Sequence, residues 1–242
     1  MSVSFRLDRL LANMGYGSRR EVQQLVRVGD VILDGQPADD ADMKIAITPD
    51  LPARLSVRGA PLDPPPGLAL MLHKPLGVTC SHKESGALVF DVLPARWRRR
   101  DPAISTVGRL DKETTGLLLL TDDGALLHRI ISPKHHVAKR YVATLARPLA
   151  GTEAAQFASG TLMLEGENKP LAPAVLEPLS PTSARLIVTE GRYHQVRRMF
   201  AAVGNHVDTL HRDRIGALDL AADLAAGEYR LMTAADIAAV FA

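Results

Sequence analysis

The sequence predicts an α+β protein of two domains, on three observations. Short apolar runs typical of β-strands outnumber helical stripes and do not alternate with them regularly, which favours a mixed, mostly antiparallel sheet over a doubly wound one. A stiff, proline-rich stretch divides the chain at 61–66. The start of the chain has helical periodicity. We therefore expect a small domain over 1–60, a linker over 61–66 and a larger domain over 67–242.

The small domain is expected to open with two helices and a hairpin. Apolar side chains recur at the spacing of one helical face, at Leu7, Leu10, Leu11 and Met14. Ser18 and Glu21 form a capping box that begins a second helix, and Gly29 ends it. Residues 31–33 form an apolar run typical of a strand, and Asp34-Gly35 is typical of a two-residue hairpin turn.

The larger domain is expected to begin with a strand over 68–72. Further β-runs are expected at 117–120, 141–145, 161–164, 174–176 and 185–189. One helical stripe is formed by Val196, Met199, Phe200 and Val203. A last helix is expected to open at Thr233, with Asp236 three residues further on.

Composition favours a folded protein and excludes several kinds of site. Of the 242 residues, 46% are hydrophobic and 23% are charged. The one cysteine, Cys80, excludes an intrachain disulfide and a multi-cysteine zinc site. The eight histidines lack the spacing of a metal-binding pair, so we expect no metal. No apolar run reaches the ~18 residues that span a bilayer and no signal peptide is visible, so we expect a cytoplasmic protein without a membrane partner.

The net charge of +2 predicts no partner by itself, but the placement of the cations does. Residues 124–152 contain five Lys or Arg, three His and no acid, and residues 96–100 read Arg-Trp-Arg-Arg-Arg. Basic blocks interleaved with an aromatic residue are typical of a nucleic-acid face. In the small domain, Arg19 and Arg20 point away from the apolar stripe of their helix, where they are available to the phosphates of a nucleic acid.

The densest chemical signal is the segment 108–124, Gly-Arg-Leu-Asp-Lys-Glu-Thr-Thr-Gly-Leu-Leu-Leu-Leu-Thr-Asp-Asp-Gly. A polar loop between two glycines precedes a buried strand and a tight turn. Asp111 lies in this loop, and a carboxylate held by a rigid strand is a candidate nucleophile. From the residues alone, the alternative that Asp111 only caps a turn stays open. Asp122 and Asp123 are interpreted as turn residues.

This segment resembles the catalytic signature of the pseudouridine synthases, which isomerise uridine in RNA. The resemblance extends over nearly the whole chain, through the motifs Leu72-His73-Lys74-Pro75-Leu76-Gly77, Lys139-Arg140-Tyr141 and Glu190-Gly191-Arg192-Tyr193-His194-Gln195-Val196-Arg197-Arg198-Met199. Residues 5–50 resemble the RNA-binding domain named after ribosomal protein S4. The resemblance implies a small S4-like domain followed by a pseudouridine synthase catalytic domain.

The resemblance also implies three catalytic residues. The essential aspartate of the family maps onto Asp111, its active-site tyrosine onto Tyr141, and the basic residue that pairs with the aspartate onto Arg197. Helical geometry favours Arg197, because it lies at the edge of the buried face of its helix, whereas Arg198 lies nearly opposite that face. We therefore expect Arg197 and Asp111 within salt-bridge distance, about 4 Å.

RNA contacts are expected around these residues. The candidates are Arg19, Arg20, Arg109, Lys139, Arg140, Arg192, His194 and Arg198. Tyr141 is expected to stack on an extruded base and to help move the carbon-5 proton. The reaction breaks an N-glycosidic bond and remakes the link through carbon 5, so we expect no cofactor. A covalent route and a glycal route stay open.

Three segments narrow the resemblance to the ribosomal small subunit pseudouridine synthase A type: 114–116, 132–136 and 198–207. This implies 16S rRNA, or a small-subunit assembly intermediate, as the partner of a monomer, and uridine-516 as the target. Two alternatives stay open. One is the same chemistry on a 23S rRNA site, and the other is a non-catalytic RNA-binding or ribosome-assembly protein. The intact set of Asp111, Tyr141 and Arg197 argues against the second.

Overall fold

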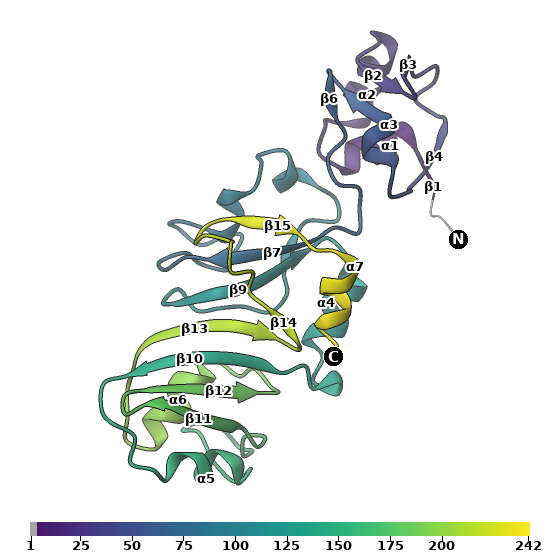
Figure 1. Cartoon of the computed structure of the whole chain (residues 1–242). Coiled ribbons are helices and arrows are strands. Elements are labelled where there is room, and N and C mark those ends of the chain that lie inside the picture. The colour runs from purple at the N-terminus through teal and green to yellow at the C-terminus, as the bar shows by residue number, and fades with distance from the viewer. Residues whose placement is uncertain (1–3) are drawn as a thin grey trace. The chain divides into compact units, whose positions relative to one another are not determined.

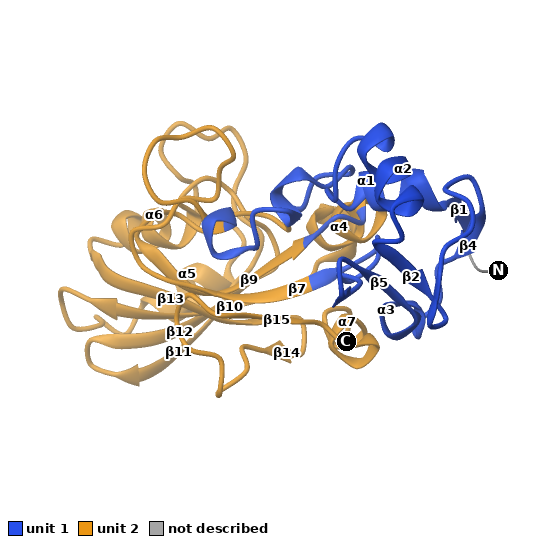
Figure 2. Cartoon of the chain, turned by 90° about the horizontal axis from the view of Figure 1, so that it is seen from above, with its two compact units in different colours: residues 1–69, 90–105, 121–123 blue, residues 70–89, 106–120, 124–242 orange. Residues whose placement is uncertain are grey.

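The computed structural model describes residues 4–242 and contains two compact units (Figure 2). Of the described residues, one unit holds 4–69, 90–105 and 121–123, and the other holds 70–89, 106–120 and 124–242. The proline-rich stretch 61–66 lies in the first unit, and its Leu62 belongs to the buried core there. Chain segments that are far apart in sequence thus build one unit.

The first unit is made of short helices and strands (Figure 1). They are β1 (Ser4–Arg6), α1 (Leu7–Asn13), α2 (Arg19–Arg27), β2 (Val31–Leu33), β3 (Gln36–Pro37), β4 (Lys44–Ala46), α3 (Leu51–Arg54), β5 (Leu55–Val57) and β6 (Ala60–Pro61), with the 3-10 turns η1 (Val89–Val92) and η2 (Trp97–Arg99) later in the chain. β1 pairs with β4, and the remaining strands form a sheet in the order β3-β2-β5-β6. The expected helix pair and hairpin are confirmed.

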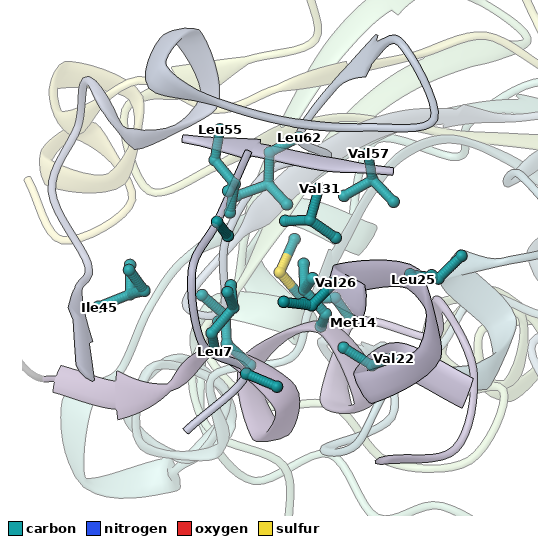
Figure 3. Close-up of a cluster of buried hydrophobic side chains, with 14 of the residues drawn as sticks. Leu7, Met14, Val22, Leu25, Val26, Val31, Ile45, Leu55, Val57 and Leu62 are labelled. Carbon is teal, nitrogen blue, oxygen red and sulfur yellow. The ribbon is translucent and has the colours of Figure 1, made fainter. Parts of the chain in front are cut away.

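Local sequence explains where the first helices begin and end. The Ser18 hydroxyl accepts a hydrogen bond from the Glu21 backbone N–H, and the Glu21 carboxylate accepts one from the Ser18 N–H, so the predicted capping box is present. Gly29, with a φ of 79°, follows the end of α2. The leucines of α1 pack with Met14 and Val22 into one core with the strands (Figure 3). This buried face fixes the opposite face of α2 toward solvent.

The second unit contains most of the strands. Its elements are β7 (Ala69–Lys74), β8 (Ser105–Thr106), β9 (Thr114–Thr121), α4 (Gly124–Ile131), η3 (Pro133–His135), β10 (Lys139–Leu145), α5 (Glu153–Ala158), β11 (Val175–Ser180), β12 (Ser183–Val188), α6 (Gln195–Ala202), β13 (Val207–Ile215), β14 (Leu218–Asp219), β15 (Tyr229–Leu231) and α7 (Ala234–Ala239). The expected strand at the start of this region and both expected helices are confirmed.

A nine-stranded sheet organises this unit (Figure 1). The strand order is β11-β12-β10-β13-β9-β7-β15, with β14 paired to β13 and β8 paired to β9. β13 runs parallel to β9, whereas β10 is antiparallel to both β12 and β13, and β7 is antiparallel to β15. The expected α+β class with a mixed, mostly antiparallel sheet is therefore confirmed.

The parallel pair β9–β13 depends on Gly116. This residue has a φ of 106° and lies opposite Arg212 in the register. A Cβ at position 116 would come within 2.2 Å of the Arg212 backbone oxygen. Only glycine allows this close approach, which fixes Arg212 in the middle of the sheet.

One expected strand is wrong. Residues 161–164 form irregular backbone after α5. Leu162 and Leu164 pack against the core of the second unit without a partner strand. The short run that suggested a strand is therefore a loop whose apolar side chains are directed inward. Among residues 4–242, no helix has the length and apolar character needed to cross a membrane.

Candidate active site

A pocket of 240 Å³ lies entirely within the second unit. Its wall is formed by the loop 107–111, by residues of β9, β10 and β13, and by the start of α6 with the loop before it. Six of the expected site residues line it, namely Arg109, Asp111, Lys139, Tyr141, Arg192 and His194. The central strands of the sheet therefore bring together side chains that are far apart in sequence.

Asp111 caps a turn with its backbone and leaves its carboxylate at the pocket. The Asp111 carbonyl accepts a hydrogen bond from the N–H of Thr114, the first residue of β9, at 3.0 Å. The side chain is 33% exposed, and its Oδ1 lies 3.4 Å from Nε2 of His194. Asp111 can therefore both cap the turn and act as a catalytic group, because the carbonyl makes the turn while the carboxylate stays at the pocket.

His194 reaches Asp111 from a strained backbone position. Its φ of 48° is in the left-handed region, directly before α6. The His194 ring stacks on Tyr193 with the ring centroids 3.9 Å apart. Tyr193 is 68% exposed. This stacked pair gives an aromatic surface beside the carboxylate, a feature suited to an unstacked base.

Lys74, at the end of β7, holds the loop that carries Asp111. Its Nζ donates hydrogen bonds to the carbonyl oxygens of Lys112 at 3.3 Å and Thr114 at 2.9 Å. The side chain is fully buried, and this burial lowers the pKa of Lys74. The bonds to backbone oxygens compensate the burial of the amine and fix the loop to the sheet.

Arg197 contacts the same loop but does not pair with Asp111. Its guanidinium donates to the carbonyl oxygens of Val207 at 2.7 Å and Glu113 at 3.0 Å. Within the described residues, the basic side chain that lies within 4.0 Å of the Asp111 carboxylate is His194. The expected direct pair is therefore wrong. The reason is that Arg197 finds two backbone acceptors at the strand and loop ends, while the residue preceding α6 takes the place beside the carboxylate.

Tyr141 and Arg212 face each other across neighbouring strands. They are partners in the register of β10 and β13. Arg212 donates from Nε to the Leu117 carbonyl at 2.8 Å and from Nη1 to the Tyr141 hydroxyl at 3.4 Å. Arg212 is only 4% exposed, and it lines the pocket. The pocket therefore has a buried cation at its inner wall.

Sequence reasoning missed Arg212, although a signal was present. Arg212 follows Leu210 at a spacing of two, so both side chains project from the same face of β13, and both are buried. A charged side chain on the buried face of a strand is expected either to have a partner inside the protein or to serve a function. Because β13 was not among the expected β-runs, the shared face of Leu210 and Arg212 was not recognised from the sequence.

The expected RNA-contact residues of the second unit differ in whether they line the pocket and in whether an acid of the protein already pairs with them. Those that line the pocket are Arg109, Lys139, Arg192 and His194. Arg140 and Arg198 are held in ion pairs with acids of their own unit, and so is Arg192. In the part of the chain that the structure covers, Arg109 and Lys139 have no ion pair at 4.0 Å or less. These two cations are therefore the most available to a ligand of the pocket.

In the first unit, Arg19 and Arg20 differ in their surroundings. Arg19 donates to the buried carboxylate of Asp8 from Nε at 3.3 Å and from Nη2 at 3.0 Å, and its side chain stays 54% exposed. Arg20 is exposed on the same helix. Asp8 thus orients one arginine at a surface that the second arginine extends.

Comparison with known proteins defines the class. Residues 69–202 match the family model of RNA pseudouridylate synthase, and residues 5–47 match the model of the S4 domain. The chain belongs to the RNA pseudouridylate synthase family, with an S4 domain before the catalytic fold. It is a pseudouridine synthase, an isomerase, as the sequence motifs predicted.

Individual relatives cover almost the full chain. The Ribosomal small subunit pseudouridine synthase A of Escherichia coli strain K12 is 44% identical over 239 residues, 97% of this chain and 99% of that protein. The Bacillus subtilis protein named Uncharacterized RNA pseudouridine synthase YtzG is 42% identical, covering 94% and 95% of the two chains. A crystal structure of a pseudouridylate synthase is 37% identical, covers 98% and 99% of the two chains, and has a TM-score of 0.67.

Proposed function

We propose that this protein converts one uridine of 16S rRNA, uridine-516, to pseudouridine, with Asp111 as the catalytic carboxylate. The observation that carries the proposal is Asp111 on a fixed loop at a pocket within a fold of this family. The choice of 16S rRNA is supported by the 44% identity to the E. coli protein named for the small ribosomal subunit. The substrate is 16S rRNA or a small-subunit assembly intermediate.

The carboxylate of Asp111 is suited to glycosyl chemistry. In a covalent route, one of its oxygens bonds to carbon 1′ of the ribose as the bond to nitrogen 1 breaks. In a glycal route, it removes the proton of carbon 2′. Either role needs an ionised carboxylate that the substrate can reach. The 33% exposure of Asp111 and its position beside His194 provide this access.

Two further residues support the reaction in this proposal. Tyr141 lines the pocket from β10, where its ring can stack on the extruded base and its hydroxyl can take part in moving the carbon-5 proton. Arg197 is a positioning residue. Through the Glu113 carbonyl it holds the loop of Asp111 to α6. It therefore acts on the carboxylate through the backbone.

The S4 domain binds the RNA without selecting the base in this proposal. Arg19 and Arg20 contact phosphates, which position the RNA but carry no direct sequence information. Arg109 and Lys139 add positive charge at the pocket. Specificity for one uridine then depends on the folded RNA and on the residues around the pocket.

The test is to map pseudouridine across all ribosomal RNA in cells with and without this protein. We expect one 16S position to lose its modification, and we expect wild type to restore it and Asp111→Asn to leave it absent. Loss of a 23S position instead would overturn the choice of substrate. An unchanged map would overturn the proposed reaction on ribosomal RNA, and would leave the alternative of a non-catalytic RNA-binding role.

A further inference from the structure

Two buried polar atoms of the pocket have no partner. Nη2 of Arg212 and Oγ1 of Thr114 are both shielded from solvent and lack a hydrogen bond within the described residues. Thr114 is 1% exposed and Arg212 is 4% exposed. Both residues line the pocket. A buried donor without an acceptor is costly for folding, so its occurrence at a pocket indicates that a ligand supplies the acceptor.

Lys139 adds a second cation to the same wall. It precedes Tyr141 by two residues on β10, so both side chains project from the same face of the strand, and both line the pocket. Lys139 is partly buried, and no hydrogen bond or ion pair satisfies its amine among residues 4–242. Burial, and the charge of Arg212 beside it, lower the pKa of Lys139 to about 8. It therefore stays protonated at neutral pH.

The acids of the pocket do not neutralise these cations. Glu190 accepts hydrogen bonds from the Ala172 N–H at 3.0 Å and from Gln195 at 3.2 Å, and it also pairs with Arg192. Asp111 lies against His194. Two positive groups thus face one cavity without a carboxylate of the protein between them, which is the arrangement of an anion site.

We propose that Arg212 and Lys139, with the hydroxyl of Thr114, bind the uracil ring as an anion at the moment when it is detached from the ribose. This inference rests on the proposed uridine isomerisation. It gives the inner wall of the pocket a catalytic role that is separate from the carboxylate. Asp111 acts on the sugar, and the cation wall, defined as Lys139, Arg212 and Thr114, acts on the base.

The chemistry requires such a partner on either route. When the bond between carbon 1′ and nitrogen 1 breaks, its electron pair leaves with uracil, whose negative charge spreads over nitrogen 1 and the two carbonyl oxygens. Asp111 meanwhile bonds to carbon 1′ or takes the carbon-2′ proton. Carbon 5 of the turned ring then bonds to carbon 1′, and the carboxylate leaves carbon 1′ or returns its proton. One proton leaves carbon 5 and one is gained at nitrogen 1, so no co-reactant is consumed.

The position of Arg212 favours uracil over a phosphate as the anion. Its Nη1 contacts the hydroxyl of Tyr141, and its Cζ lies 5.9 Å from the centre of that ring. A ligand of Arg212 therefore lies beside the aromatic ring that is proposed to stack on the base. Fixed donors aimed at charge that develops only during the reaction stabilise the transition state more than the bound substrate.

The test compares two leaving groups in single-turnover reactions on the RNA that wild type modifies. The RNA carries uridine or 5-fluorouridine at the target position. Fluorine at carbon 5 withdraws electrons and makes the uracil anion more stable, so its release needs less help from the protein. The variants are Lys139→Met and Arg212→Lys. Arg214→Met, on the same strand as Arg212 but paired with Asp219 outside the pocket, is the control.

We expect Lys139→Met to slow consumption of the target uridine about 100-fold, the loss typical of one missing oxyanion donor. On 5-fluorouridine the loss should shrink to about tenfold, with RNA affinity within about threefold of wild type, since the donor acts on developing charge. For Arg212→Lys, the loss of rate should likewise be smaller on 5-fluorouridine than on uridine. Arg214→Met should match wild type on both substrates.

An equal loss of rate on both leaving groups would overturn the inference, and so would a loss confined to RNA affinity, which indicates a phosphate contact. If Arg212→Lys does not fold, Lys139→Met decides the matter alone, because its side chain makes no hydrogen bond in the described structure. If wild type leaves the RNA unmodified, it is the proposed function that fails, and the variants are then not compared.

Discussion

The two units differ in how their buried charged side chains are hydrogen-bonded. In the first unit, Asp8 is fully buried, and it accepts hydrogen bonds from Arg6 at 2.9 Å, Arg19 at 3.0 Å and Gln23 at 3.1 Å. Arg6 is itself paired with Asp42. In the second unit, the cation wall of the pocket is left with unpartnered atoms. One cluster is complete within the protein and the other is not.

The difference separates charge that supports the fold from charge that awaits a ligand. Burial by itself would raise the pKa of Asp8, but the hydrogen bonds from Arg6, Gln23 and Arg19 outweigh it and lower that pKa to about 2. In the pocket, burial lowers the pKa of Lys139 and no acid reverses the shift. The partners of a satisfied buried charge favour its ionised form in the native state, whereas an unsatisfied buried charge destabilises the native state until a ligand binds.

The largest effect is expected from Asp111→Asn. The substitution removes the carboxylate that acts on the sugar and conserves size, so we expect isomerisation to fall by about 10⁴-fold or more. RNA affinity should stay near wild type, because affinity comes mostly from cations on phosphates. Single-turnover assays with a matched binding titration measure both.

Asp208→Asn is the control for this prediction. Asp208 is exposed on β13 and does not line the pocket, so the same change of group there should leave the rate unaltered. Substantial isomerisation by Asp111→Asn, with deamidation of the new asparagine excluded by mass spectrometry, would show that another residue is the catalytic group.

The second effect is expected from Asp8→Asn, which breaks the complete cluster. Asparagine removes the negative charge that Arg6 and Arg19 share and one of its two acceptor oxygens, so we expect the unfolding free energy to drop by about 1.5–3 kcal/mol. Urea denaturation at pH 7 measures this. The native state of the variant should keep its rate of isomerisation, since Asp8 lies in the first unit.

The pKa of Asp8 also predicts how the stability difference between wild type and Asp8→Asn changes with pH. The pKa of Asp8 is lowered on folding, so its contribution is fully present above its unfolded pKa of about 3.9. It is lost as the pH falls through the folded pKa of about 2. The stability difference between wild type and Asp8→Asn should therefore narrow over that window. A difference that is constant from pH 7 to pH 2 would contradict the account of Asp8.

A smaller effect is expected from Arg20→Gln, which tests the surface that Asp8 orients. Arg20 is exposed, so its loss should leave stability unchanged. RNA affinity should fall about tenfold at physiological salt and less at higher salt, with the salt slope reduced by about one. Arg27→Gln, at the other end of α2, is the matched control. Equal affinities for the two variants would remove Arg20 from the RNA surface.

The sequence predicted what local pattern determines. The capping box at Ser18, the turn residues of the hairpin and the stripe of α6 are set by neighbours within a few positions, and all are present. The Asp111 loop was found because its motif is continuous. Arg212 was missed because its role depends on the register of β13 with two strands distant in sequence. The pairing of Arg197 was wrong for a related reason, since a helix edge meets several acceptors and the backbone oxygens of Val207 and Glu113 compete with a carboxylate.

The smallest effect is expected from Lys139→Met measured on the free protein, and it runs opposite to the loss of activity. Methionine fills a similar volume without a buried charge, so we expect the unfolding free energy to rise by about 1 kcal/mol at pH 7. The pKa of Lys139 gives this stability difference a pH dependence, because it is about 8 in the folded protein and near 10.4 in the unfolded chain. Below pH 8, Lys139 is protonated in both the folded and the unfolded protein, so the folded state carries the full free-energy cost of burying the charge. Between pH 8 and pH 10.4 the unfolded chain keeps the proton that the folded protein has lost, so wild type gains stability relative to the variant as the pH rises. Thermal denaturation of both proteins from pH 7 to pH 10 should show the advantage of Lys139→Met shrinking across this window. A variant less stable than wild type at pH 7 would mean that Lys139 has a partner in the folded protein, and the contrast between the two clusters would then be lost.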